Sequence, residues 1–176
     1  QEKQQYELQQ PIIDELKMGL ESAYRQLREL LTTFRLKMVE DGLEASLKKT
    51  MEQLAEQSTI SFHLEFAVKQ VPLSPMEEIH LLQITREASQ NTVHHSYAQN
   101  VWISLQQLTD GQIELSVSDD GVGINQSSEK LNHYGMAIMQ ERAKQLSGEL
   151  TVQPREKGGT HVKLTFHPEG GEDTYQ

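Results

Sequence analysis

The sequence "SDDGVGI", residues 118–124, ends a stretch that otherwise has the composition of a buried strand. Asp-Gly is typical of the tight turn that joins the two strands of a hairpin. A hairpin would be followed by renewed alternation of apolar and polar residues, but residues 125–132 are mostly small or polar and have no period. We therefore expect the strand to end in a loop, in which Gly121 and Gly123 let the backbone approach a bound ligand closely.

The composition excludes several classes of protein. The chain has 176 residues, which is enough for one domain with an appendage or for two small units. Its net charge of −10 argues against nucleic acid as a partner, because phosphates need a basic surface. It has no cysteine, which excludes disulfides and thiolate metal sites. No apolar run is long enough to span a membrane, so we expect a soluble chain.

The N-terminal part of the sequence predicts one long helix. Apolar residues recur there at spacings of three and four, as in the seam of a coiled coil or a helical bundle. The seam residues are Ile13, Leu16, Leu20, Ala23, Leu27, Leu30 and Phe34. Asp41-Gly42 breaks this helix, and no second helix of equal length follows. We expect the seam to contact another copy of the chain or a helix upstream of this sequence.

The rest of the chain predicts one sheet covered by helices. Alternating segments predict strands at 61–68, 100–108, 112–119, 149–154 and 160–166. Helical patterns occupy 43–57, 76–96 and 133–147. The hairpins are mainly antiparallel, so the expected fold class is α+β, a two-layer α/β sandwich preceded by one long bundle or coiled-coil helix. The expected domains are 1–40 for that helix, 41–169 for the sandwich and 170–176 for a flexible tail.

Two further segments carry candidate chemistry. Glu87 and Asn91 are four residues apart and share a helix face, which His95 continues. A carboxylate and an amide so placed suit a hard cation, or a base beside one, although an ordinary polar pair on an exposed face explains the same pattern. Gly135 is expected where a helix begins after the polar loop. The free N–H groups of a helix N-terminus suit phosphate, although a glycine that eases a loop into a helix is the plainer explanation.

Taken together, these segments resemble a known family. "REASQN" (86–91), "DDGVGI" (119–124) and "HYGMAIMQERA" (133–143), in this order, resemble the N, G1 and G2 boxes of the GHKL (Bergerat) ATP-binding fold of sensor histidine kinases. The helix "AYRQLRELLTTFRL" (23–36) and the third box look like those of the nitrate/nitrite sensor kinases, and the resemblance covers nearly the whole chain. It implies ATP and Mg²⁺ as ligands, and transfer of the γ-phosphoryl group to a histidine for relay to a response regulator.

The resemblance also implies roles for single residues. Glu87 would be the catalytic residue that assists the attacking group, Asn91 would coordinate magnesium, and Asp119 would accept a hydrogen bond from the adenine amino group. Residues 125–132 would form the lid of the site, Gly135 and Met136 would approach the phosphates, and Thr160 would lie beneath adenine. The implied nucleotide-binding residues are Asn91, His95, Asp119, Gly121, Gly123, Tyr134, Gly135, Met136 and Thr160.

One departure from the family pattern leaves alternatives open. The family often has Lys or Arg where this chain has His94, and a neutral imidazole does not replace a permanent phosphate-binding cation. A non-catalytic dimerisation scaffold with a decayed nucleotide site therefore stays an alternative. Another GHKL ATPase or a serine kinase is a second one, which the nitrate-sensor-like helix disfavours.

The histidines define the expected scope of the chain. They are residues 63, 80, 94, 95, 133, 161 and 167, so the long helix contains none. In the family the phosphoacceptor histidine lies on the first helix of a two-helix dimerisation hairpin, and the seam helix resembles the second. We expect the acceptor, the sensor and the membrane spans to lie upstream, in an inner-membrane homodimer whose cytoplasmic portion includes this chain. The chain alone is expected to bind ATP but not to phosphorylate itself.

Overall fold

The computed structural model describes residues 17–27, 42–68, 73–123 and 129–170. The chain divides into two compact units, residues 1–40 and residues 41–176. In the first unit residues 17–27 are helical, and the seam residues Leu20 and Leu27 are exposed. Ala23 of the seam is exposed as well. The other four seam residues, Ile13, Leu16, Leu30 and Phe34, lie outside the described residues, so the partner of the seam stays a prediction.

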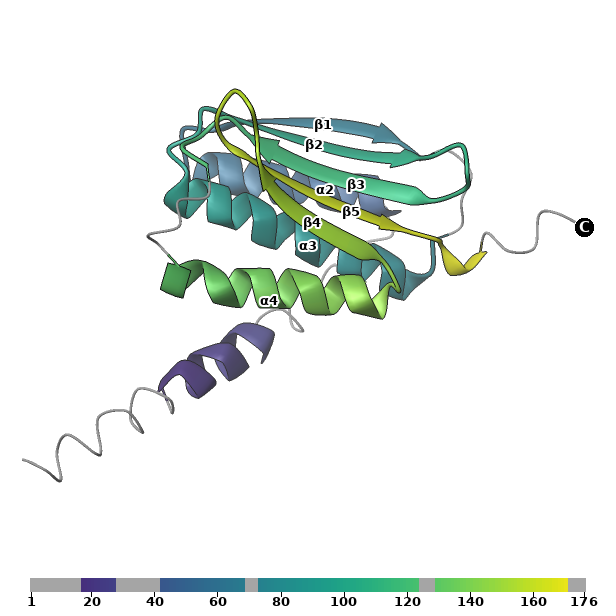
Figure 1. Ribbon diagram of the computed structural model, residues 1–176, viewed down its shortest axis with the longest axis horizontal. Helices are drawn as coiled ribbons and strands as arrows, with labels where there is room; N and C mark the ends of the chain where they lie inside the picture. The colour runs from purple at the N-terminus through teal and green to yellow at the C-terminus, as the bar shows by residue number, and fades with distance from the viewer. Residues whose placement is uncertain (1–16, 28–41, 69–72, 124–128, 171–176) are drawn as a thin grey trace, which may run out of the picture. The chain divides into compact units, whose positions relative to one another are not determined.

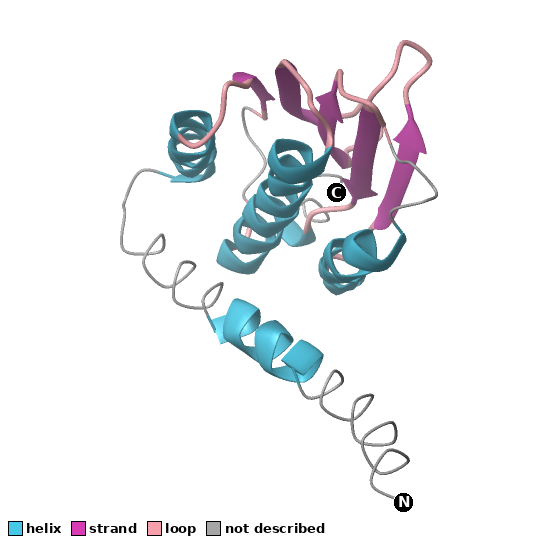
Figure 2. Ribbon diagram, turned by 90° about the vertical axis from the view of Figure 1, so that its left-hand side faces the viewer, coloured by secondary structure: helices cyan, strands magenta, loops and turns pink. Residues whose placement is uncertain are grey.

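The second unit has two layers. Figure 1 shows a sheet as one layer and the helices as the other, and Figure 2 shows that the helices all lie on one face of the sheet. This is the expected two-layer α/β sandwich, which is confirmed. The elements are α2 (Gly42–Glu56), β1 (Ser61–Ala67), α3 (Pro75–His95), β2 (Asn100–Gln107), β3 (Ile113–Asp119), α4 (Glu129–Gln145), β4 (Glu149–Pro154) and β5 (Thr160–Phe166).

The sheet is mixed, with the strand order β1-β2-β3-β5-β4. β1 and β2 are parallel, because the chain returns through α3 before it enters β2. The other three pairings are antiparallel. The hairpin patterns predict two of them, β2 with β3 and β4 with β5, but not the pairing of β3 with β5, which α4 and β4 separate in the chain. In consequence β3, which ends at Asp119, lies in the middle of the sheet with β2 on one side and β5 on the other.

Strict alternation along the central strands builds the core. In β3, Ile113, Leu115 and Val117 are buried and face the helices, whereas Glu114 and Ser116 lie on the outer face of the sheet and are half-exposed. The same period holds in β2 and β5. The buried residues of these two strands are Val101, Ile103, Leu105, Val162, Leu164 and Phe166. Asp119 continues this inward-facing row, so the alternation itself places a carboxylate under the helix layer.

The central helix α3 has a well-defined start. Ser74 is its N-cap and Pro75 occupies the first turn. The Ser74 hydroxyl accepts from the Glu77 N–H at 3.3 Å, and the Glu77 carboxylate accepts from the Ser74 N–H at 2.6 Å, which completes a capping box. Glu77 also accepts from the backbone N–H of Glu169 at 2.8 Å. These contacts tie the start of α3 to the segment that follows β5.

Helix α4 begins earlier than the sequence predicts. It starts at Glu129 rather than at residue 133, so the second half of the expected lid, residues 129–132, is helical. Glu129, Lys130 and Leu131 are strong helix formers, which explains the extension. The first half of the lid, residues 125–128, and most of the expected tail, residues 171–176, lie outside the described residues. Within the part of the chain that the structure describes, no helix is both long and apolar enough to cross a membrane.

The layered core yields a direct test of the sheet register. Leu164 is fully buried against the helices and its neighbour Lys163 lies on the outer face. Leu164→Ala should lower the free energy of unfolding by about 2–5 kcal/mol, because it leaves a cavity. Lys163→Ala, the matched control, should change it by less than about 0.5 kcal/mol. Denaturant unfolding measures both values, and equal losses would contradict the assigned register.

Candidate functional site

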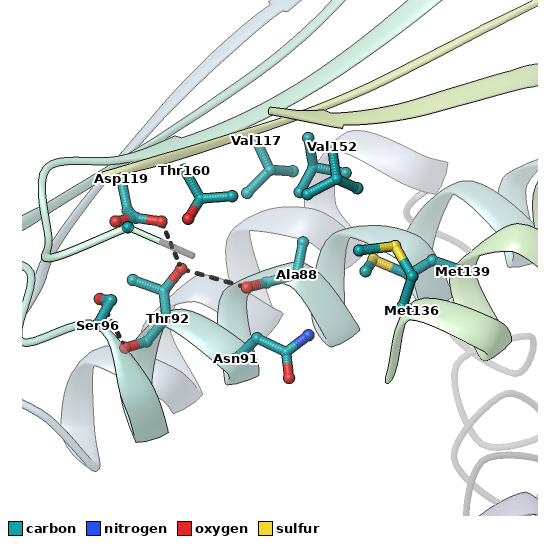
Figure 3. Close-up of a pocket in the computed structure, with 12 residues that line it drawn as sticks. Ala88, Asn91, Thr92, Ser96, Val117, Asp119, Met136, Met139, Val152 and Thr160 are labelled. Carbon is teal, nitrogen blue, oxygen red and sulfur yellow. Dashed lines mark hydrogen bonds between the residues drawn. The ribbon is translucent and has the colours of Figure 1, made fainter. Parts of the chain in front are cut away.

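A pocket lies between the sheet and helices α3 and α4 (Figure 3). Asp119 and Thr160 lie at one end of it, and Met136 and Met139 lie at the other. One end is therefore polar and much of the wall is apolar, which suits a flat, partly apolar ligand with a polar edge. The lining residues are Ala88, Asn91, Thr92, Ser96, Val117, Asp119, Gly123, Met136, Met139, Val152, Thr160 and Val162.

Asp119 is the chemically distinctive group of the pocket, with only 4% of its surface exposed. One carboxylate oxygen accepts from the Gly121 N–H at 2.8 Å, and the other lies 3.3 Å from the Thr92 hydroxyl, which also lies 3.2 Å from the carbonyl of Ala88. Among the described residues no cation forms a salt bridge with it. A buried carboxylate is costly unless donors surround it, and these two contacts leave acceptor sites that face the pocket.

The neighbouring carboxylate, Asp120, binds the backbone rather than facing the pocket. It is exposed, and it accepts from the backbone N–H groups of Gln99 and Asn100 and from the Asn100 amide, each at 2.8 Å. Burial acts to raise the pKa of Asp120, but these hydrogen bonds outweigh it and hold the pKa below its ordinary value. Asp120 thus ties the loop after β3 to the start of β2 at neutral pH, and this clamp weakens only as the pH falls through that lowered pKa.

Glycines let three backbone segments meet around Asp119. A Cβ atom on Gly159 would lie 1.9 Å from the Asp119 carbonyl oxygen, and one on Gly121 would lie 2.2 Å from the Ser96 carbonyl oxygen. Gly159 also has a φ of +91°, which L side chains rarely adopt. The sequence suggested that Gly121 and Gly123 admit a ligand. Gly123 does line the pocket, whereas Gly121 makes room for the end of α3.

Glu87 and Asn91 meet helix α4 at Gly135. A Cβ atom on Gly135 would lie 2.4 Å from a Glu87 carboxylate oxygen and 3.0 Å from the Asn91 amide nitrogen. Glu87 is 8% exposed, so the two residues do not form an ordinary polar pair on an open helix face. Gly135 lies six residues inside α4, because the helix extends back to Glu129. The expectation that Gly135 stands at a helix N-terminus is therefore wrong.

The structure brings some of the predicted site residues together and leaves others outside the pocket. Asn91, Asp119, Gly123, Met136 and Thr160 line it. Glu87, Gly121 and Gly135 are adjacent to lining residues but do not line it themselves. His95 and Tyr134 lie within α3 and α4, and their side chains are outside the described part of the structure.

Sequence reasoning missed most of the pocket wall. The apolar residues Val117 and Val162 follow from strand alternation, so the inward face of β3 and β5 was a usable signal. Thr92 and Ser96 continue the helical spacing of Ala88 by four residues each, which places all three on one face of α3. The described residues include no group of three or more His, Asp or Glu side chains that could hold a metal ion.

Comparisons with known proteins show which family the chain resembles. Residues 76–170 match the family model described as histidine kinase-, DNA gyrase B-, and HSP90-like ATPase. The chain is 41% identical over 155 residues to the sensor protein NarQ homolog of Haemophilus influenzae, covering 88% of this chain and 27% of that protein. It is 39% identical over 158 residues to the nitrate/nitrite sensor protein NarX of Escherichia coli, covering 90% and 26%. The chain thus spans about a quarter of the length of these relatives.

Solved structures show the same fold at lower identity. The histidine kinase domain of the blue-light activated histidine kinase of Erythrobacter litoralis superposes with a TM-score of 0.64 at 19% identity, covering 82% of this chain and 74% of that one. The ATP-binding domain of PrrB from Mycobacterium tuberculosis gives a TM-score of 0.57 at 18% identity, covering 70% and 92%. These structures confirm the GHKL-type sandwich that the sequence predicts.

The close approach of Gly159 to Asp119 can be tested by substitution, with Gly111 as a matched control. Gly159→Ala and Gly111→Ala both place a side chain at a φ near +90°, but a Cβ on Gly111 would meet nothing within 4 Å. The backbone strain is therefore shared, and only Gly159→Ala also drives an atom into the Asp119 carbonyl. Its loss of unfolding free energy should exceed that of Gly111→Ala by about 1–3 kcal/mol. Thermal unfolding compares the two variants, and equal losses would show that the hairpin does not touch Asp119.

Proposed function

We propose that this chain, which belongs to the family of histidine kinase-, DNA gyrase B- and HSP90-like ATPases, is the ATP-binding catalytic domain of a sensor histidine kinase. The observation that carries the proposal is the buried Asp119 carboxylate at the polar end of a pocket with apolar walls. A buried carboxylate that keeps free acceptor sites facing a pocket suits a ligand with a hydrogen-bond donor on the edge of a flat ring. The adenine amino group is such a donor.

Adenine would lie with its amino group on Asp119 and its faces against the apolar walls. Val117 and Val162 come from the sheet, and Met136 comes from α4, so the ring would be held between the two layers. The Thr160 hydroxyl lies at the same end of the pocket as Asp119 and would complete the polar edge. Guanine carries a carbonyl oxygen where adenine carries its amino group, and two acceptors facing each other in a buried site are unfavourable.

The phosphates would lie toward Asn91. Mg²⁺ binds few protein oxygens and relies on phosphates and waters for the rest, and the single Asn91 amide is consistent with that preference. Bound there, the ion would supply positive charge that neutralises the phosphate oxygens. Gly135 and Met136 would approach the phosphates from α4, because a Cβ atom on Gly135 would lie 3.0 Å from the Asn91 amide nitrogen. Glu87, one helical turn before Asn91, would orient the imidazole of the phosphoacceptor.

The acceptor histidine would be supplied by another part of the protein. In the relatives, the acceptor histidine, the membrane spans and the sensor would lie in the part of the protein that this chain does not match. By its likeness to NarX, named a nitrate/nitrite sensor protein, the whole protein would be an inner-membrane homodimer that senses nitrate or nitrite and passes the phosphoryl group to a response regulator. The exposed seam residues Leu20 and Leu27 would contact the upstream helix of the dimerisation hairpin.

Nucleotide selectivity tests the role of Asp119. Asp119→Asn should weaken ATP binding by about 1.5–3 kcal/mol, because an amide replaces a charged acceptor. Asp120→Asn makes the same chemical change one residue along and should leave ATP affinity nearly unchanged, since Asp120 bonds only Gln99 and Asn100 among the described residues. Titration calorimetry measures both variants with ATP and with GTP. Equal affinity of the unaltered chain for ATP and GTP would contradict the assignment, and no ATP binding at all would favour a dimerisation scaffold.

Glu87 and Asn91 should have separable roles. Asn91→Ala removes the magnesium ligand and should lower magnesium-dependent ATP binding. Glu87→Gln should leave that binding largely intact and slow the transfer of label from γ-labelled ATP to an added helix that carries the acceptor histidine. The chain without the added helix is the control and should stay unlabelled. Loss of ATP binding in both variants, with the fold retained, would contradict this division of roles.

A further inference from the structure

Arg155 lies in the turn between β4 and β5, where the turn fixes its backbone. Its N–H donates to the Gly159 carbonyl at 3.0 Å, and its own carbonyl accepts from the Gly158 N–H at 3.1 Å. Gly158 and Gly159 both have a φ near +90°, which shapes this turn. The backbone of Arg155 is therefore anchored directly beside the segment that approaches Asp119.

The guanidinium of Arg155 joins two parts of the sheet. One of its nitrogens, Nη1, donates a hydrogen bond to the backbone carbonyl of Asp119. Its central carbon also lies 5.1 Å from the centre of the Trp102 ring, a cation–π distance. Trp102 lies on the outer face of β2 and stacks on His63 of β1, with ring centres 5.9 Å apart. Arg155 thus connects the outer face of the sheet to the last residue of β3.

The ladder between β3 and β5 ends before Asp119, which leaves the backbone carbonyl of Asp119 open to the Arg155 side chain. That ladder ends at the pair Ser118–His161, so Asp119 is paired with Val101 of β2 but has no partner on β5. Its carbonyl would lack a strand partner on that side, and the Arg155 side chain supplies one. The carboxylate of Asp119 is held separately, by the Gly121 N–H and the Thr92 hydroxyl.

We propose that Arg155 is a positioning residue for adenine recognition: it holds the end of β3 so that the Asp119 carboxylate faces the pocket. This inference rests on the proposed function, because it concerns how well that carboxylate meets the adenine amino group. A hydrogen bond from a charged donor is stronger than one between neutral groups, so a guanidinium fixes the carbonyl more firmly than a neutral donor would. Arg155 itself does not line the pocket.

The test compares Arg155→Ala with a control in the same turn. Lys157→Ala removes the same charge from an exposed side chain two residues away. Calorimetric titration with ATP and with GTP should show that Arg155→Ala weakens ATP binding roughly tenfold and narrows the ATP/GTP affinity ratio. Lys157→Ala should change neither. Arg155→Lys keeps a charged donor and should retain part of the ATP/GTP affinity ratio. This variant also tests the inference if Arg155→Ala does not fold.

Trp102 gives an independent readout, because it is the only tryptophan in the chain. Removing the cation beside its ring should change its fluorescence emission in Arg155→Ala and leave it unchanged in Lys157→Ala. An unchanged emission would mean that the Arg155–Trp102 contact does not exist in solution, and it would overturn the inference.

The affinities separate the remaining outcomes. If the unaltered chain binds ATP selectively and Arg155→Ala keeps the same ATP/GTP ratio, the inference fails and the proposed function stands. An equal loss of ATP and GTP affinity in Arg155→Ala would likewise overturn it, because a purely structural role predicts that pattern. If the unaltered chain binds neither nucleotide, the proposed function fails and this inference fails with it.

Discussion

The structure depends on a carboxylate, that of Asp119, which is almost fully buried. The alternation that buries the apolar residues of β3 also buries Asp119, because the aspartate is the next inward-facing residue of the strand. Leaving such a group without donors would be costly. The Gly121 N–H and the Thr92 hydroxyl lie against the carboxylate oxygens. The Arg155 guanidinium donates separately, to the backbone carbonyl of the same residue.

The glycines are explained by the same constraint. Several backbone segments converge on the end of β3, and they approach so closely that side chains would collide there. Gly159 meets the Asp119 carbonyl and Gly121 meets the end of α3 at Ser96. Gly135 in turn lets α4 settle onto Glu87 and Asn91, which brings the proposed catalytic and magnesium-binding residues beneath a helix. A ligand between the layers would thus be bounded by groups from α3, α4, β3 and β5.

Local patterns predict the strands and the inward position of Asp119 because period-two alternation is a local property. The start of α4 was not predicted: a run of polar residues looks like a loop, yet Glu129 and Lys130 favour a helix. Thr92 could have been found from its helical spacing with Ala88. Arg155 could not have been found, because its contacts with Asp119 and Trp102 join residues far apart in sequence and depend on where the β3–β5 ladder ends.

A crystal structure of this chain with a non-hydrolysable ATP analogue and magnesium tests the role of Asp119 most directly. We expect the adenine amino group to lie within about 2.7–3.2 Å of an Asp119 carboxylate oxygen. We also expect the ring to lie between Val117 on the sheet and Met136 on α4. A base bound elsewhere, or a ring turned so that its amino group faces away from Asp119, would contradict the role assigned to Asp119.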